Sequence, residues 1–395
     1  MSTTTNAATP DHRPLLAVPD GDLEDLRARL RATRWAASWP VEPWSVEPWQ
    51  AGTDGAELRR LVALWADGYD WRRHEREINA LPSRSADLDG TRVNHLRFDA
   101  EREGALPLVL TNGWPSTACE LVKLARRLST PSRYGGRAED AFTVVVPSLP
   151  GFPLSAAGHP GPGGALPTHE LWHRLMHDEL GFERYGAHGS DLGAGITGRL
   201  AQAHPESVVG IHLLAADSTP REDDGHLTGE ERAFLDDVSA WAAEEGAYAH
   251  QQSTRPLTLA QGLSDSPSGL LAWILEKHRA WSDCGGDVSS RFSDDYLLTQ
   301  ASLYWFTGTI STSFRPYYER GHGLVSTLER VEVPTALALF PADLGAPPPG
   351  SWVQRRYHLT RYTPMPRGGH FAAHEEPGLL ADDITAFFRP AEQAR

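Results

Sequence analysis

Residues 184–193 read Arg-Tyr-Gly-Ala-His-Gly-Ser-Asp-Leu-Gly, and they constrain the fold more than any other stretch. Gly189 and Gly193 stand two residues either side of Asp191. This glycine-flanked pattern is typical of a sharp strand-to-helix turn, whose strained central residue carries a nucleophile and whose neighbours have no room for side chains. Ser190 is one position off this register. The stretch therefore predicts a turn with a carboxylate nucleophile, and an ordinary Gly/Asp turn is the alternative.

The composition limits the class of protein. Hydrophobic residues make up 40% of the 395, which suffices for one large core or for a core with an inserted subdomain. The formal net charge is -15 and no Lys/Arg-rich run stands out, so we expect no nucleic-acid partner. The longest apolar runs hold about five to seven residues, against the ~20 that span a bilayer, and residues 1–10 lack a signal-peptide pattern. We expect no membrane anchor.

Cysteine and tryptophan usage adds two further expectations. The two cysteines, Cys119 and Cys284, have no metal-ligand spacing, and so small a number is typical of a reduced, cytoplasmic chain. We expect neither a metal nor a cofactor. The 13 tryptophans either pack the core or form an aromatic pocket for a bulky apolar ligand, and composition alone does not separate the two.

Strands that alternate with helices predict a mostly parallel α/β sheet. A first helix is expected to start at Asp22, its N-cap, and Asp89-Gly90 is expected to form a two-residue hairpin turn. The predicted divisions are a disordered tail over 1–14, an N-terminal helical wrapping segment over 15–83, the first part of the core over 84–214, a helical cap over 215–327 and the second part of the core over 328–395.

Hydrophobic periodicity gives the individual elements. Beyond the first helix, the expected helices are 56–65, a short piece ending near 80, 168–180, 194–203, three segments in the cap (230–245, 267–281, 294–306) and 379–388. The expected strands are 86–88, 91–98, 108–110, 142–146, one leading into residue 189, 208–213, 333–340 and 358–363.

A carboxylate nucleophile requires two further groups. Asp191 would form an ester, which only an activated water can break. Histidine is a suitable base near neutral pH, and a second carboxylate fixes its tautomer. The expected order along the chain is nucleophile, acid, histidine. Asp343 and His370 follow the last two expected strands, so both lie at the sheet edge that carries Asp191. A turn aspartate and a surface histidine are the alternatives.

An oxyanion that forms on Asp191 would also need hydrogen-bond donors. The backbone N–H of Leu192 and that of Trp114, in the loop after the third expected strand, are suitably placed in this topology. Two glycines before His370 favour a loop that packs closely against its neighbours.

Several longer motifs occur in a fixed order along the chain. They are Thr33-Arg34-Trp35, Tyr69-Asp70-Trp71-Arg72, Gly113-Trp114-Pro115, Pro147-Ser148-Leu149-Pro150-Gly151-Phe152, Gly189-Ser190-Asp191, Tyr304-Trp305-Phe306-Thr307-Gly308-Thr309, Gly368-Gly369-His370-Phe371-Ala372-Ala373 and Glu375-Glu376-Pro377. With these motifs, over roughly residues 15–390, the chain resembles the α/β-hydrolase-fold epoxide hydrolases of the microsomal type, including soluble bacterial members.

The resemblance implies an α/β-hydrolase fold with a mostly parallel eight-stranded sheet, a helical cap and an N-terminal wrapping segment. It implies that Asp191 is the nucleophile, His370 the base and Asp343 the acid. Tyr248 and Tyr317 of the cap match the tyrosines that bind and protonate the epoxide oxygen, although the neighbouring Tyr318 leaves the second assignment ambiguous. The substrate pocket is expected to include Asn112, Pro115, Phe152 and Trp305.

The sequence departs from the family pattern at three places. Asn112 replaces the usual histidine before Gly-Trp-Pro, Ser116 replaces the usual glycine after it, and Leu192 replaces the usual tryptophan after the nucleophile. Backbone donors survive such changes, so the departures bear on pocket shape and hence on the substrate.

The resulting expectation is an epoxide hydrolase that forms a vicinal diol from a small-molecule epoxide and water through an Asp191 ester. A bulky apolar or aromatic substrate is expected, in natural-product biosynthesis and related secondary metabolism, and a homodimer is one option for its assembly. Two alternatives stay open: a haloalkane dehalogenase-like hydrolase, and a catalytically silent hydrolase-fold protein that binds a ligand or stabilises a partner enzyme.

Overall fold

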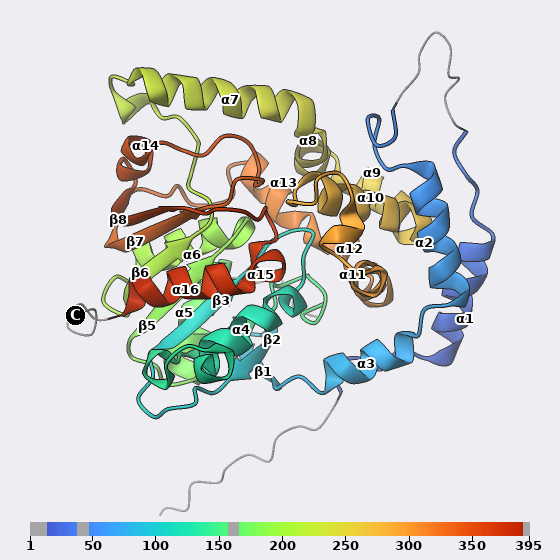
Figure 1. The fold of residues 1–395 in the computed structure, drawn as a ribbon, viewed down its shortest axis with the longest axis horizontal. Coiled ribbons are helices and arrows are strands. Elements are labelled where there is room, and N and C mark those ends of the chain that lie inside the picture. Colours follow the sequence, from blue (N-terminus) through green and yellow to red (C-terminus); the bar gives the residue numbers. More distant parts are fainter. Residues whose placement is uncertain (1–13, 38–46, 157–165, 390–395) are drawn as a thin grey trace, which may run out of the picture.

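Within the described residues, eight strands form one sheet in the order β1-β2-β4-β3-β5-β6-β7-β8 (Figure 1). A computed structural model describes residues 14–37, 47–156 and 166–389, so almost all of the expected tail lies outside it. β1 and β2 pair antiparallel, as do β2 and β4, and the other neighbours are parallel. This confirms the expected α/β-hydrolase sheet. The strands are Ser83–Leu88, Thr91–Phe98, Pro107–Thr111, Thr143–Pro147, Tyr185–Gly189, Val208–Leu213, Val331–Leu339 and Tyr357–Pro364.

The first two strands form the expected hairpin. Asp89 and Gly90 have φ values of 54° and 77°, both in the left-handed region that a two-residue turn of this hand requires. The central strands β3 and β4 are almost wholly buried, which suits their continuous runs of Val and Leu.

Helices cover both faces of the sheet (Figure 1). α4 (Val122–Ser129) and α16 (Pro377–Phe388) pack together on one face, and α5 (Thr168–His173) and α6 (Leu192–Ala203) on the other. The prediction of one helix over 168–180 was wrong in detail, because the chain widens into a π-helix over Arg174–Glu179. The remaining short helices of the core are α14 (Gly350–Gln354) and α15 (Ala372–Glu375).

The start of the first helix differs from the prediction. α1 covers Asp20–Arg31 and its N-cap is Pro19, so Asp22 is not the cap. Asp22 instead lies in the first turn, where a negative charge stabilises the positive end of the helix dipole. In α2 (Gly55–Asp67), by contrast, the Asp54 carboxylate does cap the helix.

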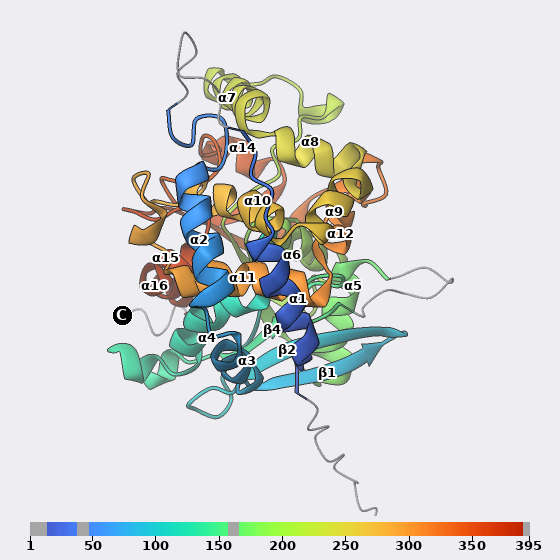
Figure 2. The same ribbon diagram turned by 90° about the vertical axis from the view of Figure 1, so that its right-hand side faces the viewer.

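The N-terminal segment lies along the outer side of the cap helices (Figure 2). α1 and α2 contact α10 (Pro267–Ala280), and α2 and α3 (Trp71–Asn79) contact α11 (Asp294–Thr307). The indole Nε1 of Trp65 donates a buried hydrogen bond of 2.9 Å to Oγ of Ser302 on α11. The cap helices are α7 (Gly229–Glu245), α8 (Ala247–Thr254), α9 (Pro256–Asp265), α10 (Pro267–Ala280), α11 (Asp294–Thr307), α12 (Ile310–Ser313) and α13 (Arg315–Gly321).

Helix α7 stands apart from the other cap helices and extends over α14 and the β7–β8 side of the sheet (Figure 1). Its inward residue Phe234 packs against Trp352 of α14, with ring centroids 5.9 Å apart. In the part of the chain that the structure describes, none of the helices is long and apolar enough to cross a membrane.

Candidate active site

Asp191 occupies the turn between β5 and α6 in a backbone conformation that side-chain-bearing residues rarely adopt, with φ 50° and ψ -126°. The flanking residues have to be glycines because a side chain would not fit at either position. A Cβ on Gly189 would lie 2.3 Å from the carbonyl oxygen of Gly193, and a Cβ on Gly193 would lie 2.2 Å from that of Thr111. The predicted sharp turn is therefore present, and α6 starts at Leu192, two residues earlier than expected.

The loop after β3 brings a backbone donor to Asp191. The N–H of Trp114 donates a hydrogen bond of 2.8 Å to Oδ1 of Asp191. This approach depends on Gly113, since a Cβ there would lie 1.8 Å from the same oxygen. No bond from the Leu192 N–H to Asp191 accompanies it in the described part of the chain, so the second donor stays a prediction.

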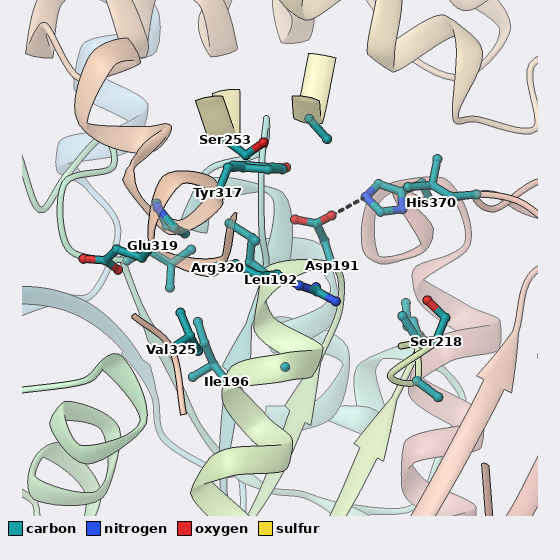
Figure 3. A pocket seen from close by; sticks show the side chains of 18 of the residues that line it. Asp191, Leu192, Ile196, Ser218, Ser253, Tyr317, Glu319, Arg320, Val325 and His370 are labelled. Atoms are coloured by element: carbon teal, nitrogen blue, oxygen red, sulfur yellow. Dashed lines mark ion pairs between the residues drawn. The ribbon is translucent and has the colours of Figure 1, made fainter. Parts of the chain in front are cut away.

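The loops after β7 and β8 bring Asp343 and His370 together. Ala342 and Gly369 form a parallel bridge between the two loops. His370 Nδ1 lies 2.7 Å from Oδ1 of Asp343, and its Nε2 lies 3.5 Å from Oδ2 of Asp191 on the other side (Figure 3). The imidazole thus stands between two carboxylates, in the arrangement that the sequence order predicted.

Glycine is required at both positions before His370, for a different reason at each. Gly368 has φ 104°, which favours glycine. A Cβ on Gly369 would lie 2.7 Å from the carbonyl oxygen of Trp281, at the end of α10. That same carbonyl accepts a 2.8 Å hydrogen bond from the His370 N–H, so a cap helix holds the base in place.

The two carboxylates control the charge of His370. Burial by itself lowers the pKa of this imidazole, but the charge of Asp343 and the bonds to both carboxylates outweigh burial and hold the pKa well above its usual value. The two carboxylates therefore favour the protonated, imidazolium form of His370.

Two tyrosines of the cap lie close to Asp191 and His370. The rings of Tyr248 on α8 and Tyr317 on α13 meet edge-on with centroids 6.0 Å apart, and both pack on the indole of Trp114. The Tyr317 hydroxyl is buried and interacts with the Tyr248 hydroxyl, but it makes no hydrogen bond of normal geometry to any described residue. Burial, followed by the charge of Asp191, raises the pKa of both hydroxyls, so both stay protonated. Tyr318 points elsewhere: it is 38% exposed and stacks on His322.

A cavity of about 1710 Å³ opens between the sheet edge and the cap, and Asp191, Asp343, His370, Tyr248 and Tyr317 all line it. Five residues from five separate segments therefore line one cavity. Of the expected pocket residues, only Phe152 lines this cavity.

Three pocket expectations were wrong. Trp305 packs under the guanidinium of Arg29 on α1, 5.8 Å from its ring centroid, because its side of α11 faces the N-terminal segment. Asn112 is buried and donates its amide N–H to the Gly113 carbonyl at 3.3 Å. Pro115 is buried within the loop that follows β3. Neither lines the cavity.

Glu120, a carboxyl that is only 3% exposed, was not identified from the sequence. Burial raises its pKa to about 7, and the charges of His370 and Asp191 also act on it. Its Oε2 has no hydrogen-bond partner among the described residues. An acidic residue near a helix start is usually exposed, so periodicity could not have identified it. Across the described ranges, no group of three or more His, Cys, Asp or Glu is arranged to hold a metal ion.

The charge balance at His370 can be tested directly. Because Asp343 supplies the largest contribution that raises the imidazole pKa, Asp343→Asn should lower the pKa of His370. The pKa is measured from the pH dependence of the histidine ring NMR signals, with His370→Gln as the assignment control. Asp236→Asn, at an exposed position of α7, should leave the pKa of His370 unchanged. An equal pKa in the Asp343→Asn variant and the wild type would contradict the arrangement.

Comparison with known proteins shows the family to which the chain belongs. Residues 13–121 match the family model described as "Epoxide hydrolase N terminus". The chain is 39% identical over 379 residues to a protein of Stigmatella aurantiaca named "Putative epoxide hydrolase", with 95% of this chain and 84% of the relative covered. It is 32% identical to epoxide hydrolase 1 of Sus scrofa, with 95% and 87% covered.

A solved structure agrees with these relatives. Aspergillus niger epoxide hydrolase superimposes with a TM-score of 0.80 at 28% identity, covering 96% of this chain and 95% of that one. The sequence relatives extend over nearly the whole chain and the solved structure shares its fold, and the chain therefore belongs to the α/β-hydrolase-fold epoxide hydrolases.

Proposed function

We propose that this chain opens epoxides to vicinal diols through a covalent ester on Asp191. One observation carries the proposal: the strained turn presents a carboxylate whose Oδ1 accepts the Trp114 N–H at 2.8 Å, while His370 stands 3.5 Å from Oδ2. A carboxylate in this position can attack carbon and form an ester, and the histidine beside it can activate the water that breaks the ester. A serine nucleophile in this fold would use the same histidine base, but its hydroxyl would have to stand at the centre of the turn. Asp191 holds that position, and Ser190 is one residue away from it.

The tyrosines supply the acid that ring opening needs. When Asp191 attacks a ring carbon, the C–O bond breaks and negative charge develops on the epoxide oxygen. Tyr248 and Tyr317 are protonated and desolvated, so their O–H groups bond strongly to that charge, and one of them transfers its proton. The Tyr317 hydroxyl makes no hydrogen bond of normal geometry to a described residue, and its interaction with the Tyr248 hydroxyl keeps the two O–H groups together for this bond.

The change of charge at Asp191 prepares the second step. Esterification removes the negative charge of Asp191, which is one of the contributions that raise the pKa of His370. The pKa of the imidazole therefore falls in the ester intermediate. Its proton passes to the tyrosinate, and neutral His370, still held by Asp343, can act as a base on water.

Protons and bonds then balance over the cycle. The activated water attacks the ester carbonyl of Asp191 while its proton moves to His370. The tetrahedral oxyanion is held by the Trp114 N–H and, in our proposal, the Leu192 N–H. Collapse breaks the bond to the diol oxygen, which takes the proton of the new carboxyl group, so Asp191 returns as a carboxylate and His370 as an imidazolium.

The size and walls of the cavity support a bulky substrate with an apolar body. Its volume of about 1710 Å³ exceeds that of pockets for drug-sized ligands, which hold roughly 300–1,000 Å³. Phe152, Trp241 and Leu192 are among its apolar lining residues. We propose an apolar or aromatic epoxide of the size found in natural-product biosynthesis.

Halide release has less support than epoxide opening. A halide would need N–H donors that face the cavity, and the indole N–H groups of Trp114 and Trp281 are buried outside its lining. The tyrosine pair, by contrast, lines the cavity and is suited to an epoxide oxygen.

An isotope experiment separates the ester route from direct attack by water. A single turnover with excess enzyme in heavy-oxygen water should place the label in the Asp191 carboxylate, because water attacks the ester carbonyl rather than the substrate carbon. The label is located by mass spectrometry of the peptide that contains Asp191. Label that appears in the diol during this first turnover, with none in the peptide, contradicts the proposal.

The two adjacent tyrosines of α13 provide a matched pair of variants. Tyr317→Phe should slow ester formation by roughly 10²–10⁴-fold, because it removes a general acid, and should affect ester hydrolysis less. Tyr318→Phe makes the same chemical change at the neighbouring, exposed side chain and should leave both rates unchanged. Stopped-flow tryptophan fluorescence resolves the two steps. Equal rates of ester formation in both variants would exclude Tyr317 as the acid.

A further inference from the structure

Beyond the reacting group, the cavity continues along one side of α6. Leu192, Ile196 and Arg199 all line it, and their spacing of four and three residues places them in one row on the helix. Figure 3 shows Leu192 and Ile196 on the wall beneath Asp191, with Val325 beside Ile196. Because α6 rises ~1.5 Å per residue, this row extends ~12 Å from Asp191. It is apolar near Asp191 and ends in a cation.

Arg199 is fixed in place at the end of this row. Its Nε donates a 2.8 Å hydrogen bond to the Ser326 carbonyl, and its Nη1 a 2.9 Å bond to the Gly195 carbonyl one turn back. Its Nη2 donates no bond to any residue within the described ranges. Burial, followed by the like charge of Arg320, lowers the pKa of this guanidinium. A partly buried cation in this position is stabilised by an anion.

A second cation stands at the open end of the cavity. Arg320 of α13 lines the cavity with a side chain that is 69% exposed, and it lies 3.9 Å from Asp217. Asp217 also pairs with Arg221 at 3.3 Å. The other acidic residue on this part of the wall, Glu319, bonds its own helix neighbour Arg315 at 2.5 Å. Positive charge is thus in local excess here, in a chain whose net charge is -15.

Apart from Glu319, which is paired with Arg315, the charges that line the cavity at its two ends differ in sign. The carboxylates Asp191 and Asp343 lie at the reacting end with His370, and Arg199 and Arg320 lie beyond an apolar wall. We infer that the substrate is an epoxide with an apolar body and a carboxylate at its far end, and that Arg199 and Arg320 bind this carboxylate. The inference rests on the proposed function and adds a substrate class to it.

The geometry limits the distance between the two ends of the substrate. The Arg199 guanidinium reaches back to the level of Gly195, so its free donor lies between one and two helical turns from Asp191, or ~6–12 Å along the axis. A carboxylate at the open end keeps part of its hydration while its body is buried, and the planar guanidinium suits it as a bidentate partner.

Turnover is tested with the full chain and matched straight-chain epoxides of graded length. Each carries a terminal epoxide at one end and either a carboxylate or a carboxamide at the other. The wild type should show a KM for the carboxylate below that for the amide by roughly ten- to hundredfold, with an optimum chain length. Arg199→Gln should largely abolish this ratio, Arg199→Lys should keep part of it, and added salt should reduce it.

Two further variants serve as controls. Arg199→Gln also removes two bonds to carbonyl groups, so Arg320→Gln provides a second test at an exposed side chain, whose contacts within the described residues are a 3.4 Å bond to Thr219 and the pair with Asp217. It should reduce the same ratio. Arg76→Gln, at an exposed position of α3, should leave the ratio at its wild-type value. Equal KM values for carboxylate and amide in the wild type, or equal effects of Arg199→Gln on both, overturn the inference.

A binding measurement separates this inference from the proposed function. The saturated alkanoate and alkanamide cannot react, and their dissociation constants are obtained from quenching of tryptophan fluorescence. Preference for the alkanoate in the wild type, and its loss in Arg199→Gln, supports the anion site even if no epoxide is hydrolysed, in which case the proposed function alone fails. Equal binding of the two ligands, together with turnover of the amide epoxide, overturns the anion site and leaves the proposed function intact.

Discussion

The strained turn at Asp191 is the constraint on which the rest of the site depends. A non-glycine residue at φ 50° and ψ -126° costs about 1–3 kcal/mol, and the surrounding backbone has to enforce it. Gly113, Gly189 and Gly193 make this possible, because each stands where a Cβ would lie 1.8–2.3 Å from another atom. The result is that the carboxylate points out of the sheet toward the loops after β7 and β8, with one oxygen already bonded to the Trp114 N–H.

Because the reacting groups are buried, the charge of each one strongly affects the pKa of its neighbours. Both carboxylates that face His370 raise its pKa, so any chemistry that neutralises Asp191 changes the base as well. Glu120, whose pKa burial raises to about 7, adds a third carboxyl whose charge acts on the same group. The reacting end of the cavity is thus acidic and its protonation states are coupled. The far end, with Arg199 and Arg320, has the opposite sign.

Much of this arrangement could be predicted from the sequence. Glycine spacing made Asp191 the candidate nucleophile, because a tight turn explains glycines on both sides of it, with an ordinary Gly/Asp turn as the alternative. Chain order identified Asp343 and His370, because the ends of parallel strands meet at one edge. The structure also separates Tyr317 from Tyr318, which the sequence left ambiguous, by burying one hydroxyl and exposing the other side chain.

Features that depend on packing between distant segments could not be predicted. Trp305 belongs to a helix that is buried on several sides, and periodicity does not tell which side faces the cavity and which faces α1. The helix start at Asp20 was missed because acidic residues are favourable both at the N-cap and in the first turn. The burial of Glu120, and the position of Leu192, Ile196 and Arg199 along the cavity, depend on how the cap packs over the sheet, which the sequence does not show.

The central claim is that Asp191 becomes covalently bound to the whole substrate, and trapping that ester tests it most directly. His370→Gln should form the ester and hydrolyse it very slowly, since the variant keeps the nucleophile and the tyrosines but lacks the base. After mixing with an epoxide, intact-protein mass spectrometry should show a gain equal to the full mass of the epoxide, and fragmentation should place it on Asp191. An unmodified variant that still releases diol, or an adduct on another residue, would contradict the account.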